Sequence, residues 1–571
     1  MVPSLETLPR DVLEHVALLT TSSSSLSSLS NILHLLLSSR TIYHQLCIHC
    51  NPHLYAQVFR TIFDVPFHRS CIPPDSALAA ELSQRFRLIR RIQRSDYSNK
   101  ALRQDLWTAY GMVLESEGLN VPHLKSVGLS GFLDGLVRKS ITEGVANNDA
   151  IECMGLAFWL LALTMTRRDI HSRSEASRDG LLLLLRPFVL SMDKTSPANA
   201  IGPRSASFSH VSTQNDSLDK GDVIYYSREQ TPIPSCPNLS LAAIILTFAL
   251  KQVDRPPCVP PNIPANRAAA LAMQWTGPTQ EDLHAVASYR TPLFLDVRQP
   301  SIAMKEWKTA AALDTLAHEY GYGAFQDGPC LRQFGASPSD TGFRYIHQNL
   351  PGVWEGMFFV SSNFLISCDI VFMKRCLLQV SPPGTSSSSL LSDVSDADFL
   401  CEWPMQCALS LHFCYIPNGP VSSEHMGEDP VHWNVDPLTL LESPSHSKNG
   451  RKTNGRRYCY DTDLPSGLSA PYEAWRDPSQ ALDCIITGKT LECHDEAWGA
   501  YNFYGRVYRD STIVMKRVPK NSWDTTLGTW IFEGHLGYGA AWVGKWRSSV
   551  ARGEARMQGI FSMRKRGPEK T

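Results

Sequence analysis

The sequence predicts an α+β protein in which helices come first and an antiparallel β-rich domain comes last. Apolar residues recur at three- and four-residue intervals through the first part of the chain, which indicates amphipathic helices. This spacing continues to about residue 320. From about residue 341, glycines and aromatic residues become frequent and alternation replaces helical spacing. We therefore expect an N-terminal helical module over residues 1–66, a helical region over 79–320 and a β-rich domain over 341–571.

Composition limits the classes of partner and of compartment. The 571 residues carry a formal net charge of −1, so nothing global predicts a nucleic-acid partner or an anionic membrane surface. The most apolar run, residues 151–165, is too short to cross a bilayer of about 30 Å and predicts a buried core helix. Glu6 and Asp11 stand where a secretory signal would be apolar, so we expect no signal peptide. Fifteen cysteines, mostly isolated, then favour a reducing compartment, the cytoplasm or the nucleus or both.

The N-terminal module begins with a helix-start signal and continues as three apolar stripes. Pro9 suits a first helical turn because its missing N–H costs nothing there, and Asp11 suits the positive end of the helix dipole. The three stripes contain Val12, Leu13, Val16 and Leu19, then Leu29, Ile32, Leu33, Leu36 and Leu37, then Ile42, Tyr43 and Leu46. Three short helices cannot bury all of these side chains among themselves. The surplus should dock onto the rest of the chain or onto a partner.

The order of these signals resembles an F-box, the helical docking module of substrate adaptors in SCF-type ubiquitin ligases. Leu8-Pro9 opens the segment, Asp11 follows two positions later, and the run Arg40-Thr41-Ile42-Tyr43 follows the apolar ladder. The serine-rich residues 20–25 make the first gap longer than is usual in that family, which leaves the register of the second helix open. The alternative is an ordinary N-terminal helical hairpin.

The resemblance implies an adaptor rather than an enzyme, with no cofactor of its own. The N-terminal helices would bind a Skp-type linker protein, and the linker would connect the chain to a cullin scaffold. The residues that would contact the linker are Leu8, Pro9, Leu13, Val16, Leu33, Leu36 and Leu37. The protein substrate and its degradation signal are not predicted.

The helical region contains several separate candidates and one arginine-rich segment. The helical candidates are residues 128–143, 147–166, 178–192, 237–252, 265–274 and 301–320. Leu82, Phe86 and Ile89 form a further stripe. Five arginines lie largely off this stripe: Arg85, Arg87, Arg90, Arg91 and Arg94. They predict a solvated basic face, with an anionic partner as the alternative.

Polar composition predicts disordered loops over 194–221, 380–397 and 443–457. Between and after these loops, the β-rich domain contains two predicted hairpins, one over 501–516 and one over 528–546.

Residues 352–356 resemble residues 528–534, and residues 371–375 resemble residues 514–517. The two pairs occur in opposite order, which fits strands built alike at the two ends of one sheet, meeting when the sheet closes.

The Gly-x-Trp of residues 352–354 is similar to the strand motif of calycin barrels, the lipocalin-like group. Together with the N-terminal segment, a C-terminal β-domain rich in Trp and Gly resembles a large group of fungal F-box proteins. The aromatic residues that we expect to capture a substrate are Trp354, Trp498, Tyr501, Trp530 and Trp542. For each one alone, a place in the domain core is the alternative.

Three motifs suggest a phosphate-binding, a zinc or a catalytic site, and each lacks a feature that such a site requires. Residues 539–546 resemble a phosphate-binding loop, but Trp546 stands where Ser or Thr should hold magnesium. His44 and His53 flank Cys47 and Cys50, but on one helix the outer two would be about 13 Å apart, too far for one zinc ion.

The third motif, residues 492–496, gathers Cys, His and acids in one run. Catalytic groups normally come from separate segments, so we expect an exposed loop here. The sequence therefore predicts neither a metal site nor an enzyme.

The leading hypothesis is a substrate-recognition adaptor of an SCF-type cullin ubiquitin ligase. The alternative is a ligand-binding β-barrel protein whose N-terminal helices are only structural. The exposure of the leucines in residues 8–37 discriminates between them: docking loses its rationale if the chain itself seals them all.

Overall fold

The computed structural model describes residues 5–21, 29–64, 73–98, 101–143, 148–190, 239–253, 263–297, 346, 349–361, 399–414, 460–462, 483–508, 512–521, 528–537, 541–549 and 558–566. The chain divides into two compact units, each of which is described by itself. The first comprises Met1–Met165 and Ser212–Leu239, and the second comprises Thr166–Val211 and Ser240–Thr571. The predicted loops 194–221, 380–397 and 443–457 and the predicted helix 301–320 fall outside the described residues.

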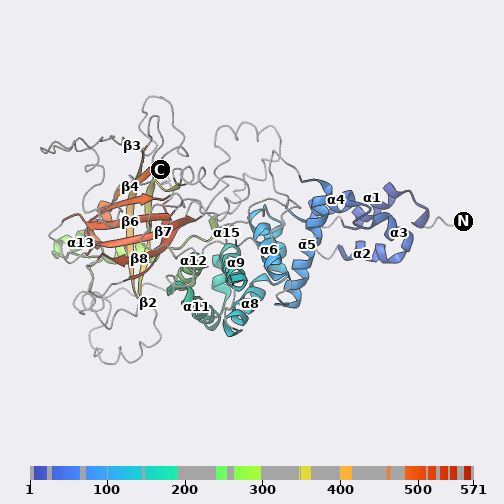
Figure 1. The fold of residues 1–571 in the computed structure, drawn as a ribbon. Helices are drawn as coiled ribbons and strands as arrows, with labels where there is room; N and C mark the ends of the chain where they lie inside the picture. Colours follow the sequence, from blue (N-terminus) through green and yellow to red (C-terminus); the bar gives the residue numbers. More distant parts are fainter. Residues whose placement is uncertain are drawn as a thin grey trace. The chain divides into compact units, whose positions relative to one another are not determined.

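The first unit is helical throughout its described part (blue to cyan in Figure 1). Its elements are the 3-10 helix η1 (Leu5–Thr7), α1 (Arg10–Thr20), α2 (Leu29–Ser38), α3 (Arg40–Leu46), α4 (Pro52–Ile62), α5 (Asp75–Arg94), α6 (Leu102–Leu114), α7 (Asn120–Ser126), α8 (Leu129–Glu143) and α9 (Asn148–Thr164). The helices expected over 128–143 and 147–166 are thus present.

Capping residues set the helix starts near the N-terminus. Pro9 stands directly before α1. The Ser39 hydroxyl accepts a hydrogen bond from the Thr41 N–H at the start of α3 (3.1 Å). The Asn51 side-chain oxygen accepts one from the Leu54 N–H at the start of α4 (3.2 Å), where Pro52 takes the first helical position.

Helix α9 is the core helix of the first unit. Residues 153–163 of this helix are buried, as the apolar run predicts. Glu152 fixes its first turns to α6, because it accepts hydrogen bonds from the Trp107 indole N–H (2.6 Å) and from Arg103 (3.0 Å). In the described part of the chain, no helix has the length and apolarity needed to cross a membrane.

The second unit combines short helices with a β-sheet (Figure 1). Its helices are α10 (Arg167–Ser172), α11 (Glu175–Leu190), α12 (Leu239–Lys251), α13 (Arg267–Ala272), α14 (Gln280–Ala287), α15 (Phe294–Val297) and α20 (Glu492–Trp498). Its strands are β1 (Gly352–Ser361), β2 (Phe399–Cys414), β3 (Tyr460–Thr462), β4 (Asp483–Lys489), β5 (Tyr501–Val507), β6 (Thr512–Pro519), β7 (Trp530–Gly537), β8 (Ala541–Ser548) and β9 (Gln558–Lys565).

Eight of these strands form a closed antiparallel β-barrel. The pairing runs β1-β2-β4-β5-β6-β7-β8-β9 and returns to β1, while the short β3 pairs with the end of β2. Strand β1 closes the sheet, because Trp354 is paired with Cys407 of β2 on one side and with Lys565 of β9 on the other. Closure leaves no free edge on these strands.

Both predicted hairpins are present, as β5–β6 and β7–β8. The prediction that the two similar segments 352–356 and 528–534 lie at the meeting ends of the sheet is wrong. Strand β7, which contains most of the second segment, pairs with β6 and β8 and not with β1. Residues 371–375 are not described.

Alternate residues of each strand fill the barrel interior. The interior aromatic rings meet edge to face, as in Trp530–Trp546 (5.1 Å between centroids) and Phe532–Phe561 (5.3 Å). Four of the five aromatic residues expected to capture a substrate belong to this core: Trp354, Tyr501, Trp530 and Trp542. The expectation that they bind a substrate is therefore corrected. Alternation predicts two faces of a strand, but it does not say which face is covered.

The outer surface of the barrel is partly covered by α12 and by the segment after α14. Phe248 of α12 stacks on Phe359, which points outward from β1 (4.2 Å between centroids). The Thr291 hydroxyl donates to the Ser562 hydroxyl on β9 (2.9 Å). These contacts place α12 beside β1 and the segment after α14 beside β9.

Substitution of Gly559 tests how tightly β9 packs against β1, where the barrel closes. A Cβ at this position would lie 1.8 Å from the Phe359 carbonyl oxygen, the atom that accepts the Trp546 indole N–H. We expect Gly559→Ala to lower the free energy of unfolding by about 1–3 kcal/mol because the core has no room for the methyl group. Denaturant unfolding followed by tryptophan fluorescence measures it. Gly537→Ala is the control, since its Cβ would meet only Ala541 O at 3.8 Å. Equal stability of the two variants would contradict the packing described.

Candidate functional site

Helices α1, α2 and α3 expose large apolar side chains. We call Val12, Leu19, Leu33, Leu37 and Tyr43 the exposed apolar face. Val12 and Leu19 are seven residues apart on α1, and Leu33 and Leu37 are four apart on α2, so each pair shares one side of its helix. Leu37 is 71% exposed. The described helices thus leave part of their apolar surface to water.

The residues expected to contact a linker divide into three groups. Pro9, Leu33 and Leu37 are exposed, and Leu8, Val16 and Leu36 are half-buried. Leu13 is fully buried (0% exposed) and is corrected to a core residue. It follows Val12 by about 100° around the axis of α1 and packs with the module interior, together with the buried Ala17 of the next turn. Val12, Leu19 and Tyr43 were not among the expected contacts, although all three lie in the predicted stripes.

Hydrogen bonds between α1 and the start of α4 hold the module together. Glu14 accepts a hydrogen bond from the Asn51 side-chain amide (2.6 Å) and pairs with Arg10 (3.0 Å). Arg10 also donates to the Cys50 carbonyl oxygen (2.7 Å). Asn51, the N-cap residue of α4, therefore also holds α1 in place through its hydrogen bond to Glu14.

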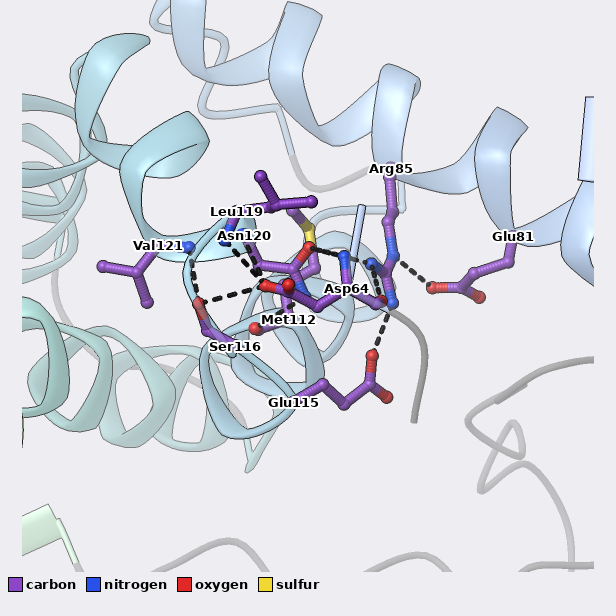
Figure 2. A network of polar contacts seen from close by, with 9 residues as sticks. All are labelled: Asp64, Glu81, Arg85, Met112, Glu115, Ser116, Leu119, Asn120 and Val121. Atoms are coloured by element: carbon purple, nitrogen blue, oxygen red, sulfur yellow. Dashed lines mark hydrogen bonds and ion pairs between the residues drawn. The ribbon is translucent and has the colours of Figure 1, made fainter. Parts of the chain in front are cut away.

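A buried polar network fixes the end of α4 to the following helices (Figure 2). One Asp64 carboxylate oxygen accepts the N–H groups of Leu119 and Asn120 at the start of α7, both at 2.9 Å. A negative charge is favourable at this end of a helix. The Asn120 side-chain oxygen in turn accepts the Asp64 N–H (3.0 Å) and one N–H of Arg85 (3.2 Å).

Arg85 lies at the centre of that network, between two acidic side chains. Its guanidinium pairs with Glu81 of the same helix (3.0 Å) and with Glu115 after α6 (2.6 Å) (Figure 2). It also lies 4.6 Å from the ring centre of Phe59. The Arg85 side chain is buried, so the expected solvated basic face is wrong at this position. The same correction applies to Arg91, which is buried and paired with Asp105 (2.6 Å). Arg87, Arg90 and Arg94 are exposed.

The four residues with zinc-like spacing do not lie on one helix. Cys47 and Cys50 belong to the turn between α3 and α4, where Cys47 is buried and Cys50 exposed. His53, on α4, pairs with Asp75 instead (2.7 Å). Within the ranges that the structure describes, no group of three or more His, Cys, Asp or Glu side chains is arranged to hold a metal ion.

A cleft of about 740 Å³ in the second unit is the other candidate site. Its floor is the outer face of three neighbouring strands, where Gln406, Glu355 and Arg564 stand side by side in register. Its walls come from α14 and α20. The Arg564 guanidinium donates twice to Glu355 (2.8 and 2.6 Å).

Tyr289 lies beneath the guanidinium of Arg564, 5.6 Å from ring centre to charge. Burial, reinforced by the negative charge of Glu355, raises the pKa of Tyr289 to about 12. Its hydroxyl therefore stays protonated in the physiological range. Glu355 and Arg564 are 209 residues apart in sequence, so no local motif indicates this pair.

The segment 492–496, expected to be an exposed loop, is instead part of helix α20. Its His494 is buried while Cys493 is exposed, and both line the cleft. Burial, helped by the nearby charge of Arg517, lowers the pKa of His494 to about 3. The imidazole is therefore neutral near neutral pH.

Trp498 ends α20 and packs edge to face on Trp403 (6.2 Å between centroids). It is half-buried and lines the cleft. Of the aromatic residues expected to meet a substrate, it is the one that reaches a surface.

Substitution of Arg85 tests whether the buried polar network stabilises the first unit. We expect Arg85→Met to lower the free energy of unfolding by about 3–5 kcal/mol, because Glu81 and Glu115 would remain buried without their cation. Arg90→Met is the matched control, since Arg90 is exposed on the same helix. Urea unfolding followed by circular dichroism measures both. A loss in Arg85→Met no larger than in Arg90→Met would contradict the network's role.

The lowered pKa of His494 predicts that the stability of the fold depends on pH. Its folded pKa of about 3 lies below the ordinary 6.5, so the unfolded chain takes up the proton first as pH falls. The contribution is complete above pH 6.5 and is lost progressively towards pH 3. Between pH 7.5 and pH 5 we expect the wild type to lose on the order of 2 kcal/mol more than His494→Gln. Denaturant titrations at the two values test this, and parallel losses would show that His494 is not the group responsible.

Comparison with known proteins finds no relative of this chain. No protein-family model, no curated protein and no solved structure matches the chain. The functional conclusion therefore depends on the exposed apolar face, on the cleft and on the sequence resemblance.

Proposed function

We propose that this chain is a substrate-recognition adaptor of an SCF-type cullin ubiquitin ligase. The N-terminal helices bind a Skp-type linker protein, and the linker connects the chain to the cullin scaffold. The unit that contains the barrel binds the protein substrate. The chain itself catalyses nothing, and its expected place is the cytoplasm, the nucleus or both.

The observation that carries this proposal is the exposed apolar face. Val12, Leu19, Leu33 and Leu37 belong to stripes that resemble the F-box, yet the described helices leave them open to water. Large apolar side chains exposed together on helices that contact one another are common at protein–protein interfaces. Its burial by a partner would release on the order of 25 cal/mol for each Å² covered.

The proposed contact set follows from exposure. It keeps six of the expected residues, Leu8, Pro9, Val16, Leu33, Leu36 and Leu37, and adds Val12, Leu19 and Tyr43. Leu13 supports these residues from the core of the module.

The mechanism is an increase in effective concentration. An adaptor that holds a substrate beside a charged conjugating enzyme converts a bimolecular encounter into a local one. The alternative is a ligand-binding β-barrel protein whose N-terminal helices are only structural. The described strands offer such a ligand no place in the barrel lumen, because their inward side chains pack together as a core.

The exposed apolar face is tested by co-purification of a Skp-type linker with the full chain. We expect the double change Leu33→Asp and Leu37→Asp to reduce recovered linker at least about tenfold, because charges cannot be buried in an apolar interface without cost. Leu271→Asp is the matched control, since Leu271 is an exposed leucine of α13 in the second unit. Circular dichroism verifies that each variant keeps its helices. Equal recovery with all three proteins, or no recovery with the wild type, would overturn the proposal.

A further inference from the structure

Four polar side chains at the cleft are almost completely buried, and each keeps at least one polar atom without a hydrogen-bond partner among the described residues. Tyr289, Glu355, Gln406 and His494 line the cleft and are each between 5% and 8% exposed. Buried polar groups in proteins are nearly always paired. These four are not sealed from the cleft, so a bound molecule can supply the missing partners.

The unused groups can be named atom by atom. Both bonds from Arg564 reach Oε1 of Glu355, which leaves Oε2 with no donor among the described residues. Oε1 of Gln406 lies 3.9 Å from the Cys493 thiol, and its amide Nε2 has no described acceptor. The Tyr289 hydroxyl and both ring nitrogens of His494 likewise make no hydrogen bond within the described ranges.

These groups offer a mixed set of donors and acceptors. Glu355 accepts, the Gln406 amide donates, and the Tyr289 hydroxyl and the neutral His494 ring can each do both. A peptide main chain, with alternating N–H and C=O groups, satisfies such a set. The volume of about 740 Å³ is that of a site for a small ligand or a few residues of chain.

The charges indicate which side chain such a peptide should carry. Three cations line the cleft: Arg564, Lys565 and Arg566. Arg564 pairs with Glu355, Lys565 donates to the Asn349 carbonyl oxygen (2.8 Å), and Arg566 is likewise engaged. The carboxylates are less so: Oε2 of Glu355 is unused, and Glu281 of α14 is exposed with no ion pair among the described residues. Both carboxylates and Trp498 line the cleft, so a cation on the ligand would be attracted by the carboxylates while its apolar stem would find an aromatic ring in the same cleft.

We propose that this cleft binds a short peptide segment carrying a lysine or arginine side chain. The basic group faces Glu355 and Glu281, and the main chain bonds to Gln406, Tyr289 and His494. As a site for a ubiquitination substrate it rests on the proposed function. As a peptide site it does not, and peptide binding is measured without the linker.

The probe is a fluorescent positional-scanning library of hexapeptides with acetylated and amidated ends, titrated onto the full chain by anisotropy. We expect pools fixed as Lys or Arg at one position to bind at least about tenfold more tightly than pools fixed as Glu there. Glu355→Gln should abolish that preference. Because Glu355 also holds Arg564, the exposed Glu281→Gln is the second variant, with an expected loss of about threefold. Glu143→Gln, an exposed glutamate of α8 in the first unit, is the control and should change nothing.

Cys493 gives an independent readout of where the peptide lies. Its thiol is exposed and lines the cleft, so a bound peptide should slow its alkylation by iodoacetamide. Cys50, exposed in the first unit, is the internal control within the same mass spectrum. The inference is overturned if no pool binds, if the favoured pools are acidic, if both glutamate variants keep the wild-type preference, or if Cys493 reacts at the same rate with and without peptide. Linker recovery in the same variants reports separately on the proposed function.

Discussion

The guanidinium of Arg85, buried between Glu81 and Glu115, is the interaction on which the N-terminal half of the account depends. Arg85 joins α5 to the residues after α6, and through Asn120 it joins Asp64 at the end of α4. A buried ion network of this kind is fully favourable only when every member is in place, so it specifies one arrangement of these helices. The module α1–α4 is thereby fixed to α5, and its exposed apolar face stays open to a partner.

Closure of the barrel plays the corresponding part in the second unit. Strand β1 pairs on both sides, so neither end of the sheet is left as a free edge. One side of each barrel strand then faces a core that contains many aromatic rings. With the interior occupied by side chains of the described strands, a ligand of the barrel would have to bind on the outer surface. The cleft lies there, over strands β1, β2 and β9. Helices α14 and α20 form its walls around the neighbouring side chains of Gln406, Glu355 and Arg564.

The parts that the sequence predicted are those decided by neighbouring residues. The stripes on α1 and α2, the apolar helix α9 and the hairpins β5–β6 and β7–β8 follow from spacing alone. Arg85 could not be predicted, because its environment comes from Asp64, Glu115 and Asn120, which are distant in sequence. Neither could the inward direction of Trp354, since alternation is the same for both faces of a strand. The Glu355–Arg564 pair likewise depends on the register of β1 with β9.

Hydrogen–deuterium exchange on the full chain, with and without a Skp-type linker, tests the central claim most directly. The account predicts that the linker slows exchange in peptides covering α1, α2 and α3 and leaves the barrel strands unchanged, because burial of the exposed apolar face would stabilise those helices against local opening. Unchanged exchange in α1–α3 at a linker concentration that saturates binding would contradict it, and so would protection confined to the second unit.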